Sequence, residues 1–309
     1  MDIKMDEIEE ATRNFNEQFV IGRGGFGTVY KVMLKRIATT VAVKVLQQLS
    51  SHRKEFEHLL RYRHENIIPL YGFSMDEERF CLIYQYMPNG SLEDRLARKY
   101  DSVPLTWEQR HNILLGTARG LQFIHSAMDK PLLHGDIKSA NVLLDKHFEA
   151  KIGDFGLAKV ANSGGNFKYT HVSEVDPNAK VYGSKAYLPA EYLSGQHKLR
   201  KDTDVYSFGV VIFETCTGRM ALDEQRPSGQ KALTDVMSLH DEANTLTKLM
   251  DATVLAWPVQ LWCLVVQLGI RCTAAKRTSR PAIERVTSLY RLLQADLFCL
   301  TFLYIYVES

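Results

Sequence analysis

Apolar and polar residues follow two different patterns along this chain, and the pattern changes near residue 88. Before that point, apolar residues alternate with others in short runs, which is the spacing of β-strands. Two strands are predicted as a hairpin over 19–34, on either side of a glycine cluster, and three more over 39–46, 66–73 and 79–87. Beyond residue 88 the chain changes to helical patterns.

Turn and capping residues support this division of the chain. The residues PNGS at 88–91 form a turn cluster, and Ser91 followed by Asp94 marks the start of a helix. Thr106 and Gln109 have the spacing of a capping box ahead of a further helical run. The change from strands to helices therefore coincides with a predicted turn.

Two other helices complete the pattern. A long apolar helix is predicted from Asp204 to Thr217, where Gly218 ends it. A short helix is predicted near the start of the chain, with apolar positions at Met5, Ile8, Ala11 and Phe15. The sequence thus predicts an α+β fold of two lobes with a cleft between them, the first small and mainly β, the second larger and mainly helical. The predicted segments are a flanking helix over 1–15, an N-lobe over 16–87, a C-lobe over 88–296 and an apolar tail over 297–309.

Composition and charge exclude several classes of protein. The 309 residues carry a formal net charge of +2, so neither nucleic acid nor a membrane surface is indicated as a partner. The five cysteines are scattered without a CxxC pair, which indicates a reducing, cytoplasmic compartment and argues against a disulfide framework or a zinc site. The longest apolar run, 297–307, is shorter than the about 20 residues of a membrane-spanning helix, so no span is predicted. It is expected to pack on the domain or to form an ill-defined end.

The glycine cluster of the hairpin is the first candidate for chemistry. Gly22, Gly24 and Gly27 have the spacing GxGxxG. A dinucleotide-binding site requires a helix after the glycines and an acidic residue about 20 positions on. Here a strand follows, and Gln47 occupies that position. A glycine hairpin can still bring backbone N–H groups close to phosphates, because no Cβ blocks the approach. A plain tight turn is the alternative.

Charged residues follow at positions where a charge needs a partner. Lys44 lies in the middle of an apolar strand, and an unpaired buried charge is costly. It either reaches solvent along its stem or meets a partner, and Glu55 on the next helical stretch is placed to be that partner.

A second group of polar residues lies in the predicted C-lobe. Asp136, Lys138 and Asn141 fall in one loop, and Asp154 opens the triplet Asp154-Phe155-Gly156. A carboxylate and an amide on adjoining loops can hold magnesium between phosphates. A free Asp136 could accept a hydroxyl proton. Each residue taken alone is more typical of an ordinary turn.

Taken in order, these motifs resemble those of a eukaryotic protein kinase. The matching stretches are GRGGFGTV, VAVK, HGDIKSAN and DFG, and the resemblance covers about residues 16–295. DIKSAN and the GSKAY segment at 183–187 resemble serine/threonine kinases. YMPNGSLEDRL, the HGD form and YLPAEY together resemble the Pelle/interleukin-1-receptor-associated kinase family, in which Tyr84 would be the tyrosine gatekeeper. Plant receptor-like kinases share much of this pattern.

The resemblance implies an ATP- and Mg²⁺-dependent enzyme that phosphorylates serine or threonine hydroxyls of protein substrates in Toll/interleukin-1-receptor-type innate immune signalling. Asp136 would be the catalytic base, Lys138 would stabilise the γ-phosphate, and Lys44 would hold phosphates while paired with Glu55. Asn141 and Asp154 would hold magnesium. The residues implied in the ATP site are Ile21, Gly22, Gly24, Gly27, Val29, Ala42, Lys44, Tyr84, Tyr86 and Met87.

The resemblance also implies structural and regulatory roles. Glu191 would pair with Arg280, and Asp204 would hold the backbone around His134. Gly135 stands where many kinases carry an arginine that binds a phosphorylated residue of the activation segment, so this latch is expected to be missing. Candidate phosphorylation sites in that segment are Ser163, Thr170 and Ser173.

One departure bears on activity. Only eleven positions separate Lys44 from Glu55, fewer than is usual in kinases, so the helix is expected to lack its first turns and to begin near Ser51. A catalytically weak scaffold and a plant-type receptor-like kinase fragment are therefore the alternatives. Pelle-type proteins also carry an N-terminal death domain, for which this chain has no room. The chain is thus expected to be a fragment or altered transcript, with receptor and adaptor contacts made by a region outside it.

Overall fold

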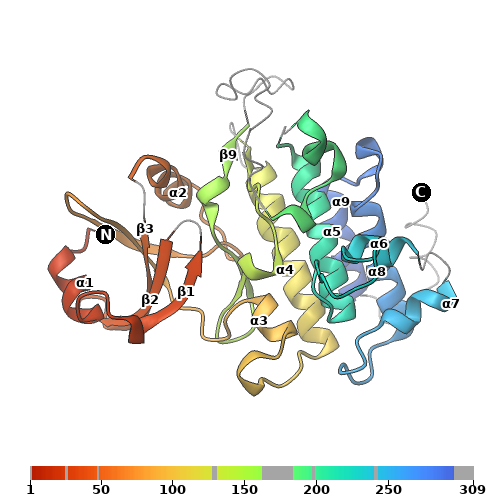
Figure 1. Ribbon diagram of the computed structural model, residues 1–309, viewed down its shortest axis with the longest axis horizontal. Helices are drawn as coiled ribbons and strands as arrows, with labels where there is room; N and C mark the ends of the chain where they lie inside the picture. The colour runs from red at the N-terminus through yellow and green to blue at the C-terminus, as the bar shows by residue number, and fades with distance from the viewer. Residues whose placement is uncertain are drawn as a thin grey trace.

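The computed structural model describes the backbone of residues 2–24, 27–46, 49–126, 131–161, 184–196, 199–239 and 243–295. These residues form two lobes, with the N-lobe at the left of Figure 1 and the helical C-lobe at the right. The N-lobe is an antiparallel sheet in the order β1-β2-β3-β5-β4. Its strands are β1 Val20–Gly24, β2 Gly27–Leu34, β3 Thr39–Leu46, β4 Leu70–Met75 and β5 Phe80–Gln85. The predicted α+β class and the five strands are confirmed.

Strand β4 begins later than the predicted 66–73, because its first residues pair with the other lobe. The Ile68 N–H donates to the Ile152 carbonyl at 2.9 Å, and the Ile152 N–H donates to the Asn66 carbonyl at 2.9 Å. This stretch therefore joins the lobes.

The two faces of the sheet are covered by different helices. Helix α1, Met5–Thr12, packs on one face of the sheet through Ile8. Ile8 lies in one apolar cluster with the alternate residues of β2 and β3 that point to this face. Helix α2, Leu49–Arg61, lies on the opposite face (Figure 1). Helix α1 is shorter than the predicted 5–15, since the chain turns left-handed at Arg13 and Phe15 then packs against the Tyr30 ring.

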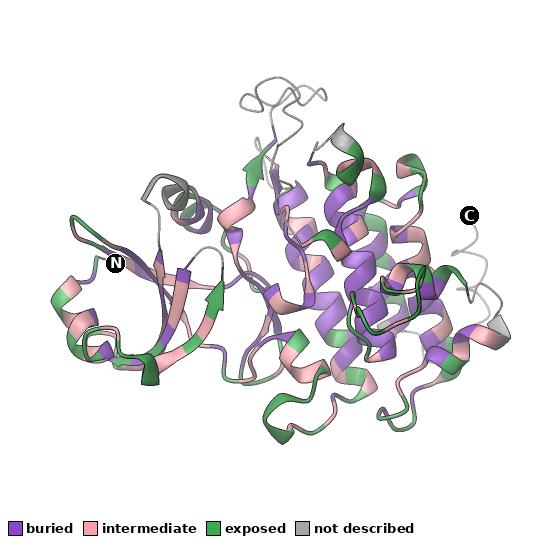
Figure 2. Ribbon diagram, in the orientation of Figure 1, coloured by how far each residue is buried: buried purple, intermediate pink, exposed green. Residues whose placement is uncertain are grey.

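The C-lobe is built on long buried helices. Helix α5 is buried over most of its length, as Figure 2 shows, and packs on α8, while α4 packs on α9. The predicted caps are present: Ser91 with Asp94 begins α3, Thr106 exchanges hydrogen bonds with Gln109 ahead of α4, and Gly218, at φ 66°, ends α5. The C-lobe helices are α3 Leu92–Leu96, α4 Trp107–Ser126, α5 Lys201–Thr217, α6 Leu233–Ser238, α7 Ala243–Leu246, α8 Val259–Cys272 and α9 Ile283–Ala295.

Short elements carry the functional loops. Strands β6 and β9 form one pair, and β7 and β8 another. Their bounds are β6 Leu132–Leu133, β7 Val142–Leu144, β8 Ala150–Ile152 and β9 Lys159–Val160. The single-turn helices are η1 Glu17–Phe19, η2 Lys99–Asp101, η3 Ser139–Asn141, η4 Phe155–Leu157, η5 Lys185–Tyr187, η6 Tyr192–Gln196, η7 Thr247–Leu249 and η8 Arg277–Ser279. Strand β8 stops at Ile152, because Asp154 takes a left-handed conformation at φ 59° and η4 follows.

Some predictions lie outside the described residues: the apolar tail 297–309 and the phosphorylation sites Ser163, Thr170 and Ser173. Within the described part of the chain, no helix combines the length and apolar character needed to cross a membrane.

Candidate active site

The lysine of β3 lies in a cluster of carboxylates between the lobes. Strand alternation turns Lys44 to the face that carries α2. Its Nζ lies 2.9 Å from Glu55 Oε2 and 2.9 Å from Asp154 Oδ1. Lys44 is 8% exposed and Glu55 is fully buried. Lys44 and Glu55 are therefore in contact across the short connection.

The electrostatics of this cluster favour charged side chains. Burial opposes the charge on Lys44, but the carboxylates of Glu55 and Asp154 outweigh it and raise the pKa of Lys44. Burial likewise opposes ionisation of Asp154, yet the charge and hydrogen bond of Lys44 lower the pKa of that carboxyl. The cluster is thus an ion triad around a buried lysine rather than a lysine that reaches solvent.

Helix α2 begins at Leu49, two residues before the predicted Ser51, so Glu55 is its seventh residue. Tyr84 of β5 adds a second contact to Glu55, because its hydroxyl donates to Glu55 Oε1 at 2.8 Å. Burial first, and then the charge of Glu55, raise the pKa of Tyr84 well above its usual range, so the phenol remains a donor. Tyr84, predicted in the ATP site, thus directs its polar end to α2.

The loop with Asp136 is held by its own polar residues. Lys138 Nζ donates to Asp136 Oδ2 at 2.7 Å, and Asn141 Nδ2 donates to the Asp136 carbonyl at 2.8 Å and to Oδ2 at 3.1 Å. The Gly153 N–H donates to the Asn141 carbonyl at 2.9 Å, which brings Asp154 next to this loop. The four polar residues predicted for the C-lobe are therefore brought together.

Sequence reasoning did not single out Ser184, although it marked the segment that contains it. The Ser184 N–H donates to Asp136 Oδ1 at 3.3 Å, and Lys138 Nζ donates to Ser184 Oγ at 3.1 Å. The serine of GSKAY was the available signal, but its partners lie more than 40 positions away. Ser184 therefore closes a ring of contacts around the Asp136 carboxylate.

Asp204 holds the backbone that precedes Asp136, as the resemblance implied. Its Oδ2 accepts from the His134 N–H at 2.9 Å, and its Oδ1 accepts from the Gly135 N–H at 2.8 Å. His125 Nε2, which was not predicted, lies 2.8 Å from Asp204 Oδ2. The positions of His134 and Gly135 are thereby fixed by one buried carboxylate.

The ring of His134 adds a second link between the two loops. His134 Nδ1 accepts from the Asp136 N–H at 3.2 Å, and His134 Nε2 lies 3.1 Å from the Gly153 carbonyl. One nitrogen must accept and the other donate, so this arrangement requires the neutral ring with its proton on Nε2.

Gly135 is favoured by backbone geometry. Its φ is +79°, and a Cβ at this position would lie 2.9 Å from Leu199 Cδ2. Any side chain here meets both a left-handed backbone and a buried leucine. The missing arginine is therefore not a simple exchange of side chain.

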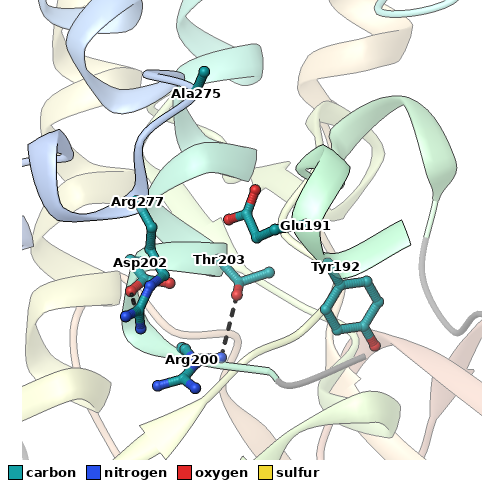
Figure 3. Close-up of a pocket in the computed structure, with 7 residues that line it drawn as sticks. All are labelled: Glu191, Tyr192, Arg200, Asp202, Thr203, Ala275 and Arg277. Carbon is teal, nitrogen blue, oxygen red and sulfur yellow. Dashed lines mark hydrogen bonds and ion pairs between the residues drawn. The ribbon is translucent and has the colours of Figure 1, made fainter. Parts of the chain in front are cut away.

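The predicted brace of the C-lobe is present. Arg280 Nη1 donates to Glu191 Oε1 at 2.6 Å, and Nη2 donates to Oε2 at 3.1 Å, a bidentate pair. Beside it lies a cavity of about 290 Å³, shown in Figure 3, in which Arg277 pairs with Asp202 at 3.4 Å. None of the residues that line this cavity belongs to the Lys44 cluster or the Asp136 loop.

The residues predicted to contact ATP lie on β1, β2 and β3 and at or just beyond the end of β5. Val29 pairs with Lys44 in register, and Ala42 pairs with Tyr84. Gly27 is needed where β2 begins its pairing with β3, because a Cβ there would lie 2.1 Å from the Val45 carbonyl oxygen. The other predicted positions are Ile21, Gly22 and Gly24 on β1, and Tyr86 and Met87 just beyond β5.

Asn141 and Asp154 are suitable in kind for the predicted metal. Magnesium prefers oxygen ligands and keeps several waters, so it needs only one or two protein groups beside substrate phosphates. Asn141 uses its Nδ2 in the contact with Asp136, which leaves its amide oxygen as the potential ligand. The carboxamide and carboxylate oxygens therefore fit this ion.

A β-sheet lobe with a buried lysine–glutamate pair, placed over a helical lobe with an aspartate–lysine–asparagine loop, defines a protein kinase domain. The protein kinase domain family matches residues 15–288, and the chain belongs to this family.

Several of its curated relatives are Pelle-type kinases. It is 44% identical to the Pelle-like serine/threonine-protein kinase pik-1 of Caenorhabditis elegans, over 71% of this chain and 47% of the relative. It is 38% identical to interleukin-1 receptor-associated kinase 1 of Mus musculus, over 94% and 45%. It is 36% identical to the serine/threonine-protein kinase pelle of Drosophila melanogaster, over 96% and 60%. Arabidopsis kinases also match. The resemblance to Pelle-type kinases is confirmed, and the chain spans about half the length of these relatives.

Proposed function

We propose that this chain transfers the γ-phosphate of ATP to serine or threonine hydroxyls of protein substrates. The observation that carries the proposal is that both halves of the site are assembled at once. Lys44 contacts Glu55 at 2.9 Å in the N-lobe, while Lys138 and Ser184 surround the Asp136 carboxylate in the C-lobe. A site of this kind works mainly by positioning and by neutralising charge.

Asp136 orients the substrate hydroxyl and accepts its proton. Asp136 is only 6% exposed and its carboxylate is fixed by Asn141 and Lys138, so it reaches a substrate in a single orientation. Lys138 stabilises negative charge on the transferred group. Ser184, in contact with both, is placed to position the accepting side of the site.

Lys44 holds the phosphates of ATP, and Glu55 fixes the position of its ammonium group. Asn141 and Asp154 would hold magnesium, which supplies charge neutralisation on the phosphate oxygens when bound. The backbone of β1 and β2 near Gly22, Gly24 and Gly27 covers the phosphates.

The names of the relatives support a place in receptor signalling. We propose that the chain acts in Toll/interleukin-1-receptor-type innate immune signalling, in the cytoplasm, with receptor and adaptor contacts made by a region outside it. Arabidopsis relatives named probable receptor-like protein kinases support the alternative of a receptor-like kinase. The short connection before Glu55 favoured a weak scaffold, but the formed Lys44–Glu55 pair supports catalysis instead.

The test is transfer of labelled phosphate from ATP to a generic basic protein, with wild type compared with Asp136→Asn. We expect transfer by wild type and a loss of orders of magnitude in the variant, with the fold preserved by circular dichroism. Transfer at equal rates by both proteins would reject the proposed site. No transfer by wild type would favour the scaffold.

A further inference from the structure

A buried chain of three hydroxyl and carboxyl groups runs beneath the proposed active site. Ser139 of η3 lies with its Oγ 3.1 Å from the hydroxyl of Tyr187, which belongs to η5. That hydroxyl lies 2.9 Å from both carboxylate oxygens of Glu214 in α5. Ser139 is fully buried, Glu214 is 3% exposed and Tyr187 is 8% exposed. The three residues are distant in sequence, so only the fold brings them together.

Two members of this hydrogen-bonded group, Ser139 and Tyr187, each adjoin a part of the site. Ser139 directly follows Lys138 and begins the turn that contains Asn141. Tyr187 ends the turn that follows Ser184, whose N–H contacts Asp136. A shift of the Ser139–Tyr187 contact would therefore move the Lys138 side of the site relative to the Ser184 side.

Glu214 is a carboxyl group that forms no ion pair with the described residues. Among the residues that the structure describes, no lysine, arginine or histidine pairs with it. Besides the hydroxyl groups, it accepts one N–H, that of Ala221 at 3.2 Å. The titratable groups that act on it are Tyr187 of η5 and Glu93 of α3, and the charge of Glu93 opposes ionisation.

Glu214 consequently titrates near neutrality. Burial raises the pKa of its carboxyl to about 7, against the hydrogen bonds of Tyr187, Ser139 and Ala221, which lower it. Tyr187 does not compete for this change, because burial and the charge of Glu214 raise its pKa far above its usual range.

The protonation state of Glu214 sets the direction of the hydrogen bonds. When the carboxylate is ionised it can only accept, so Tyr187 donates to it and the Tyr187 oxygen is free to accept from Ser139. When the carboxyl is protonated, the oxygen that carries the proton becomes a donor and competes with Ser139 for the Tyr187 oxygen. Protonation therefore weakens the contact between Ser139 and Tyr187.

We propose that Ser139, Tyr187 and Glu214 form a positioning relay that holds the two sides of the catalytic site in register, and that ionisation of Glu214 completes it. The inference rests on the proposed kinase function. Because the relay touches no reacting atom, it acts on turnover rather than on ATP binding. Turnover should therefore rise with pH through neutrality.

The test compares pH profiles of kcat for wild type, Ser139→Ala and Glu214→Gln. Loss of one hydrogen bond of ordinary strength corresponds to about a tenfold change. We expect wild type to gain up to about tenfold in kcat between pH 6 and 8, and Ser139→Ala to be about tenfold slower at pH 8 with no such rise. Glu214→Gln should also lack the rise, and KM for ATP should change little in both variants. Ser74→Ala, the same substitution at a buried serine in β4, is the matched control and should keep the wild-type profile.

A rise that persists in Glu214→Gln, or an unchanged kcat in Ser139→Ala, would overturn the relay while leaving the kinase function intact. No transfer by wild type would instead reject the kinase function, and the relay with it.

In either case unfolding supplies a readout that is independent of activity. The raised pKa makes folded Glu214 retain a proton that the unfolded chain releases, so wild-type stability should fall as pH rises from about 4.5 to about 7. Glu214→Gln should reduce that slope, and an unreduced slope would show that Glu214 does not titrate in this network.

Discussion

The hydroxyl of Tyr84 offers the sharpest test of how the short connection is tolerated. Helix α2 must keep Glu55 beside Lys44, and Tyr84 supplies a hydrogen bond from β5 at 2.8 Å. Tyr84→Phe removes this bond and leaves the ring in place. Glu55 keeps both contacts with Lys44, at 2.9 and 3.1 Å, so the ion pair itself survives. The change therefore isolates the contribution of one donor to the inward position of α2.

The magnitude follows from the charge on Glu55. A hydrogen bond to a charged group contributes about 1.5–3 kcal/mol. Lys44 still contacts the same oxygen, so we take the lower bound of about 1.5 kcal/mol. In an outward position of α2, Glu55 lies in water and this bond is absent, so the substitution does not change the free energy of that state. The inward arrangement should therefore lose about tenfold in its equilibrium.

The assay is kcat/KM for ATP, together with hydrogen exchange of the α2 backbone. We expect kcat/KM to fall by up to about tenfold in Tyr84→Phe and exchange in α2 to accelerate. Tyr30→Phe is the matched control, because both tyrosines are 7% exposed and lie in the N-lobe, but Tyr30 is on the face away from α2. Equal kcat/KM and exchange rates for the two variants would refute the claim that Tyr84 holds α2.

Two further predictions concern the metal and phosphate site and the glycine of the catalytic loop. Lys44→Met and Asp154→Asn should each lower phosphate transfer by orders of magnitude while circular dichroism shows an intact fold, and unchanged transfer in either would remove that residue from the site. Gly135→Ala should destabilise the domain by at least about 1–2 kcal/mol in denaturant unfolding, from the left-handed backbone and the contact with Leu199. Gly229→Ala has nearly the same φ with nothing within 4 Å of its Cβ, so an equal loss there would show that the contact adds nothing.

Local chemistry explains which parts of the fold could be predicted from the sequence. The pairs Ser91 with Asp94 and Thr106 with Gln109 form within one helical turn, so the spacing alone indicates the cap. The glycine after α5 is equally local. The start of β4 could not be predicted, because residues before Leu70 pair with a strand some 80 positions further along the chain.

The site shows the same division between local and distant contacts. Asp136, Lys138 and Asn141 lie within six positions of one another, so their spacing alone indicates that they share one loop. The contacts of Ser184 with Asp136 and of Ser139 with Tyr187 join residues 48 positions apart, and serine is common in turns, so neither stood out. Glu214 did leave a signal, since it is a single acidic residue in the apolar run VVIFETC. A carboxylate in such a helix needs buried partners, but their identity depends on the fold.

The position of Gly135 connects these observations to regulation. An arginine latch would place a cation beside the catalytic loop, where a phosphate could bind it. In this chain the same place is closed by Leu199, which packs with Leu133 and Ala161. The loop is fixed instead by Asp204, which accepts hydrogen bonds from the backbone N–H groups of His134 and Gly135. These contacts need no phosphate, so the structure accounts for an assembled loop without the latch. Substitution of Gly135 by arginine would disturb the backbone as well as add charge, and therefore could not isolate the effect of a latch.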